Sequence, residues 1–385
     1  MTDLESRSLP SLLTFVVDNR GRSCPTASSG FPLIATNCIR DDSLYPVSEN
    51  LRFVSQEVYD NWFRSHPEPD DIVFVCKGSP GRVAMVPDPV PFCIAQDMVA
   101  LRVDRNVVHP HYLYYALRNP SVRGQIESMH VGTMIPHFKK GDFGKLNLSI
   151  HGDLTEQECV AGVLGALDNK IAANGRLIET ILELVSIRLE AALADQELDA
   201  KLSDVAEFHN RRRVPLSARE RQDRIGHGPY YGATGQFGFV DTAIFDEQLV
   251  LVGEDGSVVT AEGLPVVQYI WGPAWINNHA HVLTGRMVST ELLYFMIKRC
   301  QVDSLVTGAA QPKLSMGNLG SLVLNLPDPN VRDVVEEFTT TAMGQFRSLA
   351  DESRTLAELR DFLLPLLMSG RLRVKDAEKQ VEAVV

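Results

Sequence analysis

The chain has 385 residues, enough for two or three domains, and its composition, 44% hydrophobic and 22% charged, is that of a globular protein. It has no run of eighteen apolar residues, so we expect no membrane association. Its first residues do not form a basic stretch followed by an apolar core, so we expect no signal peptide and a cytoplasmic location. The six cysteines form no CxxC pair, which argues against a zinc site or a disulfide scaffold. The net charge of −12 lowers the expectation of DNA binding, but the acidity is densest in residues 151–195, and the larger segments on either side are close to neutral.

The first large segment, residues 1–152, mixes strand and helix patterns. The stretch "DDIVFV" from Asp70 predicts a buried strand, and a glycine-containing turn, "KGSPGR", follows it. A helix is expected over 109–128. The segment ends in "GTMIPHFKKGDFGKLNLSI" (132–150), whose glycines and final apolar alternation predict a loop followed by a strand. We therefore expect an α/β domain here.

Residues 153–197 predict a long amphipathic helix. Its apolar residues recur at alternating spacings of three and four, the heptad pattern of a coiled coil. They are Leu164, Leu167, Ile171, Ile178, Ile181 and Val185. Asn174 interrupts this stripe, and Thr155 with Glu158 predicts a capping box at the start of the helix.

Residues 198–327 repeat the pattern of the first segment. "EQLVLV" corresponds to "DDIVFV", and "GAAQPKLSMGNLGSLVLNL" (308–326) matches the closing stretch of the first segment at a fixed offset of 176. "LYFMI", in a helix expected around 289–301, matches "LYYAL" in the first segment. The offsets drift by only a few residues, as they do in a duplicated unit with small loop insertions, so the chain carries an internal repeat.

Residues 328–373 predict a second long helix, and a tail, 374–385, follows it. The helix repeats the apolar stripe of the first at an offset of 178. Its stripe comprises Val335, Phe338, Ala342, Leu349, Leu356, Leu359, Leu363 and Leu366. Pro365 is expected to kink the helix near its end, and Ser369-Gly370 to stop it.

The two helices have matching registers, with Asn174 opposite the polar break at Glu352. An antiparallel coiled coil is therefore the expected arrangement; the alternative is that each helix packs only on its own domain. The predicted fold class is α/β (α+β): two duplicated domains separated by two long helices, with pseudo-twofold symmetry.

No common catalytic motif is present: the chain has no GxxxxGK[ST] phosphate loop, no GxGxxG between a strand and a helix, and no GxSxG elbow. The pairs "HPH" (109–111) and "HAH" (279–281) could each offer two metal ligands. They occupy non-equivalent places in the repeat and lack an acidic partner at standard spacing, so we expect surface or packing histidines and no metal site.

The chain resembles the specificity subunit of Type I restriction-modification enzymes. The resemblance rests on "LTEQECVAGVLGALDNKIAANGRLIETILELVSIRLEAAL" and "LAELRDFLLPLLMSGRL", supported by "DIVFVCKGSPGRVAMV", "YLYYALRN", "GTMIPHFKKGDFGKLNLSI" and "GPYYGATGQFGFVDTAIFDEQLVLVGEDGSVV". It covers nearly the whole chain, and the order and duplication of the motifs are more specific than any single one. The opening "TEQ" of the first helix has no counterpart in the second, where "DPNVRDVVEEF" stands.

The resemblance implies a non-catalytic DNA-specificity subunit. Two target-recognition domains would read the two halves of a split target in double-stranded DNA, and the helices would form the spacer between them. Two methyltransferase subunits would contact the spacer helices and methylate adenine with S-adenosylmethionine, and restriction/translocase subunits, which use ATP and Mg²⁺, would cleave DNA. This chain would bind no cofactor. A coiled coil of about 30 residues spans about 45 Å, roughly one and a quarter turns of duplex, so helix length would set the unread gap.

The candidate DNA contacts are polar or basic residues on loops and glycine-containing turns. In the first domain they are Lys77, Ser79, Arg82, Gln96, Thr133, His137, Lys139 and Lys140. In the second domain they are Arg211, Arg212, Arg219, Arg221, Arg224, Tyr230, Tyr231, Gln236 and Lys313. The alternative for the arginines is a solvated linker or helix face, and for the tyrosines it is packing within a turn. Two other functions remain open: a metal-dependent nuclease that uses the histidine pairs, and a coiled-coil scaffold without DNA readout.

Overall fold

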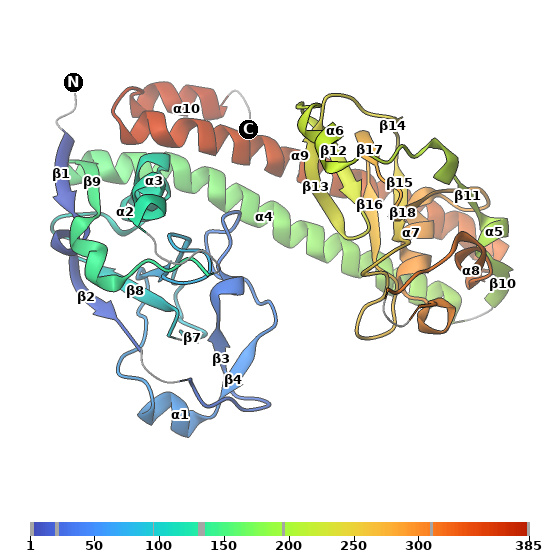
Figure 1. Ribbon diagram of the computed structural model, residues 1–385, viewed down its shortest axis with the longest axis horizontal. Coiled ribbons are helices and arrows are strands. Elements are labelled where there is room, and N and C mark those ends of the chain that lie inside the picture. The colour runs from blue at the N-terminus through green and yellow to red at the C-terminus, as the bar shows by residue number, and fades with distance from the viewer. Residues whose placement is uncertain are drawn as a thin grey trace. The chain divides into compact units, whose positions relative to one another are not determined.

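The computed structural model describes residues 4–19, 23–94, 96–129, 135–194, 197–308 and 311–382 (Figure 1). The chain forms two compact units. Unit 1 comprises residues 1–175 and 351–385, and unit 2 comprises residues 176–350. Each unit therefore contains one α/β domain together with part of each of the two long helices.

The α/β domain of unit 1 contains three antiparallel or mixed sheets. A two-stranded sheet pairs β1 (Leu4–Ser8) with β9 (Asn147–His151). A four-stranded antiparallel sheet has the order β2 (Leu13–Val17), β8 (Met98–Val103), β5 (Ile72–Val75) and β6 (Val83–Met85). A small sheet has the order β4 (Arg52–Val54), β3 (Phe31–Ile34) and β7 (Cys93–Ile94), in which β3 and β7 run parallel. The short helix α1 (Gln56–Asn61) follows β4.

The helix expected over 109–128 is two helices, α2 (Pro110–Arg118) and α3 (Pro120–Met129). The break falls at Asn119, directly before Pro120. Proline lacks the N–H that would continue the hydrogen-bond ladder and restricts the residue before it, so a new helix begins there.

The α/β domain of unit 2 has the same organisation. β10 (Glu197–Lys201) pairs with β19 (Val323–Pro327). The four-stranded sheet has the order β11 (Ala206–Phe208), β18 (Ala280–Gly285), β15 (Leu249–Gly253) and β16 (Val267–Ile270). A second sheet has the order β13 (Gly235–Val240), β12 (Gly228–Gly232), β17 (Pro273–Ile276) and β14 (Phe245–Asp246). The helices of this domain are α5 (Leu202–Val205), α6 (Ala218–Gln222), α7 (Thr290–Lys298) and α8 (Met316–Gly320).

The predicted duplication is confirmed by the strand orders. The order β2-β8-β5-β6 in the first domain corresponds to β11-β18-β15-β16 in the second, and β4-β3-β7 corresponds to β13-β12-β17. Each small sheet contains one parallel pair, β3 with β7 and β12 with β17. A helix packs on each four-stranded sheet, α2 against β6 and α7 against β16.

One of the two inner strands of each four-stranded sheet, β5 and β15, is buried on both faces. In β5, Ile72 and Phe74 belong to the core shared with α2 and the long helices, while Val73 and Val75 face a second core on the other side. In β15, alternate residues likewise contribute to two different cores. This two-sided burial explains why both strands read as continuous apolar runs rather than alternating ones.

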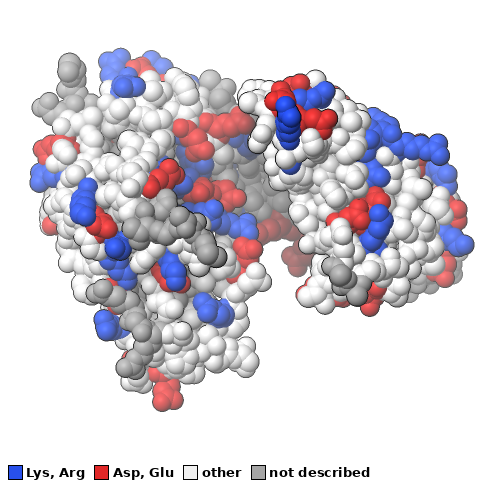
Figure 2. All heavy atoms as spheres, viewed as in Figure 1, with Lys and Arg blue, Asp and Glu red and all other residues white. Residues whose placement is uncertain are grey.

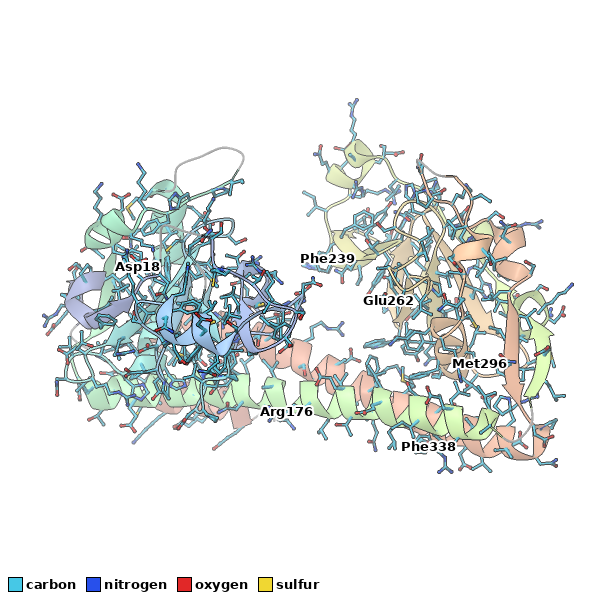
Figure 3. The ribbon with its side chains drawn as sticks, turned by 90° about the horizontal axis from the view of Figure 1, so that it is seen from below. Asp18, Arg176, Phe239, Glu262, Met296 and Phe338 are labelled. Carbon is cyan, nitrogen blue, oxygen red and sulfur yellow. The ribbon has the colours of Figure 1, made fainter. Side chains whose placement is uncertain are left out.

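The long helices are α4 (Leu154–Leu193) and α9 (Pro329–Met368), and a short helix, α10 (Val374–Glu382), follows. Within unit 1, Asn174 Nδ2 donates a hydrogen bond to Glu352 at 2.7 Å. Within unit 2, the Arg188 guanidinium lies over the Phe338 ring at 5.2 Å (Figure 3). Asp168, six residues before Asn174, pairs with Arg360, eight residues after Glu352, so residue numbers rise along one helix as those of its partner fall and the predicted antiparallel pairing is confirmed in unit 1.

The predicted apolar stripes are buried or half-buried along both helices. The predicted capping box is wrong: the Asp153 carboxylate accepts the Thr155 N–H at 2.9 Å, so the residue before α4, and not Thr155, caps it. Pro365 lies inside α9, and Gly370, with φ of +65°, follows the end of the helix as predicted. In the part of the chain that the structure describes, no helix is both long and apolar enough to cross a membrane.

Candidate nucleic-acid interface

Both domains hold a glycine turn against their closing loop in the same way. In the first domain the Gly78 N–H donates to the Pro136 carbonyl oxygen at 2.9 Å, and in the second the Gly256 N–H donates to that of Pro312 at 3.0 Å. The φ angles of these glycines, +90° and +86°, lie in the left-handed region that favours glycine. The proline of the repeated stretch therefore anchors, in each domain, the turn that follows the buried strand.

The side chains at this shared scaffold differ between the domains. Lys77 forms a β-bridge with His137 in the first domain, and Asp255 forms one with Lys313 in the second. Lys313 Nζ lies 3.2 Å from Asp255 and 3.7 Å from Glu254, and the hydrogen bond to Asp255 raises the pKa of Lys313. The first domain thus presents two basic residue types at positions where the second presents an ion pair.

Arg82 belongs to a cluster of arginines around Asp41. Its Nε lies 3.4 Å from the Asp41 carboxylate, which also pairs with Arg123, and Arg118 donates to the Asp41 carbonyl oxygen at 2.6 Å. Burial pushes the pKa of Asp41 upward, but these guanidinium groups more than offset it and hold that pKa below its usual value. The Arg82 charge is consequently partly compensated before any ligand approaches.

Lys140 is engaged as well, because its ammonium group pairs with Asp18 and its side chain is only 20% exposed. Asp18 is labelled in the first domain in Figure 3. Three other predicted contacts are exposed or half-buried, so a ligand can reach them: Ser79, Gln96 and Lys139. Thr133 lies outside the described residues.

In the arginine-rich segment of the second domain, residues 211–224, some arginines pair with acidic residues and others have no such partner among the described residues. Figure 2 shows Lys and Arg side chains on the side of this domain where α6 and the loop before it lie. Arg211 and Arg219 are exposed and have no ion-pair partner within the described ranges. Arg212 pairs with Glu247 at 2.7 Å and lies 4.2 Å from the centre of the Phe245 ring. Arg211 and Arg219 are therefore the cations most available to phosphate groups.

Arg213, which is not among the predicted contacts, points inward. Its Nη1 donates to Glu254 at 2.7 Å and to the Ala280 carbonyl oxygen at 2.6 Å. The sequence "RRR" does not show which of the three arginine side chains points into the domain.

Arg221 and Arg224 form cation–π contacts with the second sheet of this domain. The Arg221 guanidinium lies 5.3 Å from the ring centres of both Tyr230 and Phe237. Arg224 lies 5.0 Å from the Trp275 ring. Tyr230 is only 2% exposed, so it supports this cluster and is not open to a base. Such contacts are worth about 0.5–1 kcal/mol at exposed sites and fix the arginine side chains.

The β12–β13 hairpin also exposes apolar residues that are not among the predicted contacts. Phe237 is 49% exposed and Phe239 58%, and Ile225, which precedes β12, is 87% exposed. The predicted contacts Tyr231 and Gln236 are half-buried and exposed, respectively. The sequence signal for these exposed phenylalanines is "GQFGF" (235–239), where a glycine stands one or two residues before each phenylalanine. Glycine is unusual inside a strand and often marks a place where another molecule or chain comes close.

The histidine pairs do not form a metal centre in the described part of the chain, where no group of three or more His, Cys, Asp or Glu could hold an ion. His281 is fully buried, with Nε2 2.7 Å from the Leu314 carbonyl oxygen and Nδ1 2.8 Å from Asn210. The rings of His109 and His111 lie 5.9 Å apart. These contacts are those of packing histidines.

The long helices expose apolar side chains at equivalent positions of the repeat. Leu184 on α4 is 50% exposed, and Phe362 on α9, which lies 178 residues further on, is 59% exposed. Leu177 and Ile187 extend the exposed apolar surface of α4. Exposed apolar residues at heptad spacing on a helix that is already paired on its other side indicate a surface for a further partner.

Comparisons with known proteins agree with one another. A family model described as Type I restriction modification DNA specificity domain matches residues 31–183 and 198–334. A Haemophilus influenzae protein named as a putative type I restriction enzyme specificity subunit is 30% identical over 146 residues, which is 37% of this chain and 37% of that relative. The match thus spans little more than a third of the length of the relative.

Two solved structures are similar over nearly the full chain. The Type-I restriction-modification system S subunit from M. genitalium covers 95% of this chain and 96% of its own, at 19% identity and a TM-score of 0.56, which is a likeness of fold alone. The HsdS subunit from Thermoanaerobacter tengcongensis covers 96% and 97%, at 15% identity, but its TM-score of 0.39 is too low to bear on the fold.

Proposed function

Because the chain belongs to the Type I restriction modification DNA specificity domain family, we propose that it is a non-catalytic subunit that reads a bipartite DNA target. It directs adenine methylation and cleavage by partner subunits. The supporting observation is one scaffold used twice with different side chains. The glycine turns at Gly78 and Gly256 have the same backbone contacts, while Lys77 and His137 stand where the second domain has Asp255 and Lys313. Two half-sites of different sequence require this combination of a shared scaffold and different side chains.

The unpaired cations of the second domain support phosphate contacts. Loss of one contact reduces the slope of log affinity against log salt by about one and weakens binding to all duplexes alike. We therefore expect Arg211→Ala and Arg219→Ala each to weaken DNA binding by the assembled complex. Arg212→Ala is the matched control, because Glu247 already occupies that guanidinium. Fluorescence anisotropy over a salt series measures this; equal salt slopes for all four proteins would overturn the assignment.

We further propose that two methyltransferase subunits dock on the long helices at Leu184 and Phe362. Equivalent exposed positions, one in each unit, suit two identical partners. Leu184→Glu and Phe362→Glu should each remove one methyltransferase copy from the purified complex, whereas Leu184→Met should retain both. Light scattering after gel filtration reports the stoichiometry, and full complexes with both glutamate variants would contradict this docking site.

The cofactors belong, in this proposal, to the partners: S-adenosylmethionine to the methyltransferase subunits, and ATP and Mg²⁺ to restriction/translocase subunits. Co-expression with the candidate partners followed by single-molecule methylation mapping tests the whole assignment. A split target with methylated adenine in both halves is expected. A genome without such a motif would exclude the proposed function.

A further inference from the structure

The β12–β13 hairpin of the second domain has a prominent exposed apolar edge. β13 is the end strand of its sheet, and it carries Phe237, 49% exposed, and Phe239, 58% exposed. Ile225 is 87% exposed, and its neighbour Gly226 packs so closely on the Asp241 backbone that a Cβ there would lie 2.4 Å from the Asp241 Cα. Ile225 is therefore held beside the end of β13. In Figure 3, Phe239 lies at the rim of the domain, well away from Met296 in the core on α7.

Ring and cation–π contacts hold the hairpin that carries this edge. Arg221 lies over both Tyr230 and Phe237, and these two rings meet edge to face at 5.0 Å. Arg221 itself belongs to α6, whose start is fixed by a capping box between Ser217 and Glu220. Phe239 consequently projects from a backbone that its surroundings hold in place, which lowers the cost of ordering it on binding.

The segment that leads into the edge and forms it is rich in arginine. Residues 211–240 contain six arginines and only two acidic residues, in a chain whose net charge is −12. Arg211 and Arg219 have no ion-pair partner in the part of the chain that is described. An apolar edge accompanied by available cations fits a polyanion that also offers apolar faces, and duplex DNA, with its stacked bases, is such a partner.

The first domain carries the same residue type at the equivalent place. Phe53 on β4 pairs with Pro32 on β3, just as Phe239 on β13 pairs with Pro229 on β12. The two positions share the same strand order and the same neighbouring proline, although the surrounding sequences differ. Phe53 is half-buried, and its carbonyl oxygen accepts the Ala27 N–H at 2.8 Å. The repeated unit thus places a phenylalanine at this position in both domains, and that of the second domain is the exposed one.

We propose that Phe239 is a wedge that inserts between two base pairs of the half-site bound by the second domain and unstacks that step. This inference rests on the proposed function. An apolar side chain that enters a base step kinks the duplex, and the energy of unstacking is offset by the new contacts. A base that is to be methylated must leave the stack, and a neighbouring step that is already opened lowers the cost of its extrusion.

The test uses the full chain assembled with its methyltransferase subunits and duplexes that contain the target found by methylation mapping. 2-Aminopurine replaces single bases of each half-site in turn, because its fluorescence rises when stacking is lost. Apart from the adenines that are methylated, the wild-type complex should give a rise at one step of the half-site bound by the second domain. Phe239→Ala should abolish that rise and weaken target binding about tenfold. Phe239→Trp should retain both, and Met287→Ala, a matched change at an exposed apolar residue of the same unit, should behave as wild type.

The outcomes separate the possible roles of this residue. An undiminished fluorescence rise with Phe239→Ala would show that Phe239 is not the wedge. Loss of the methyltransferase subunits from the Phe239→Ala complex would show that the edge contacts protein instead of DNA. If the wild-type complex binds no duplex at all, the proposed function itself fails, and the wedge with it. If it binds the target and stacking is lost only at the methylated adenines, only the wedge fails.

Discussion

Asp168 on α4 and Arg360 on α9 form a salt bridge of 2.6 Å in the interior of unit 1, with side chains only 4% and 5% exposed. The Tyr115 hydroxyl on α2 donates to the same carboxylate at 2.7 Å. Burial lowers the pKa of Arg360, but the interaction with Asp168 outweighs it and raises that pKa overall. One carboxylate thus joins both long helices to α2, the helix that packs on the four-stranded sheet of the same unit.

Removing one partner of this pair should be far more costly than removing both. Asp168→Leu leaves a buried guanidinium unpaired, and breaking a buried pair costs about 3–5 kcal/mol. The double variant Asp168→Leu/Arg360→Met replaces both charges with apolar groups and should recover most of that loss. Urea denaturation of the two single variants and the double variant measures the free energies of unfolding. Strictly additive losses would show that the two side chains do not depend on each other.

Gly308 should tolerate alanine less well than Gly256, although their φ angles, +88° and +86°, are nearly the same. A Cβ on Gly256 would meet no atom within 4 Å, whereas one on Gly308 would lie 2.5 Å from the Gln311 carbonyl oxygen. Gly256→Ala should therefore cost only the backbone strain, about 1–2 kcal/mol. Gly308→Ala adds a steric clash with backbone and should cost more. Thermal melts of the two variants give the order, and equal shifts would contradict the clash.

His281 should make unit 2 sensitive to acid. Burial lowers its pKa from the usual 6.5, and this effect exceeds the opposing influence of the Leu314 carbonyl and Glu254. The folded state therefore favours neutral His281, so its contribution is complete above about pH 6.5 and is lost as the pH falls below that value. Between pH 7.5 and 5.5, His281→Gln should therefore lose less stability than the wild type. Equal pH dependence in urea titrations would exclude this role.

Helix length should set the unread gap of the DNA target. Deleting residues 171–177 and 349–355 removes one heptad from each helix, together with Asn174 and its partner Glu352. The registers on either side stay matched, and each helix shortens by about 10 Å, which corresponds to about three base pairs. Methylation mapping should reveal the same half-sites with a gap that is shorter by that amount. Deleting one heptad from a single helix mismatches the pair and serves as the control that should lose activity.

The sequence by itself determined the repeat, the two long helices and their antiparallel pairing. These features depend on periodic burial, which the spacing of Leu164, Ile171 and Val185 records directly. The opposition of Asn174 and Glu352 followed from register alone, and the structure shows the hydrogen bond between them. The glycine turn at Gly78 was likewise visible, because a left-handed backbone demands a residue type that can be read from the letters.

Only the tertiary structure decided which polar and apolar side chains are free to meet a ligand. Arg211, Arg212 and Arg213 are consecutive, yet the first is unpaired in the described chain, the second is bound to Glu247, and the third is directed inward to Glu254. Exposure decided that Phe239, and not the buried Tyr230, is accessible to a partner. The physical reason is that a side chain's availability depends on neighbours distant in sequence, whereas backbone periodicity depends on neighbours three and four residues away.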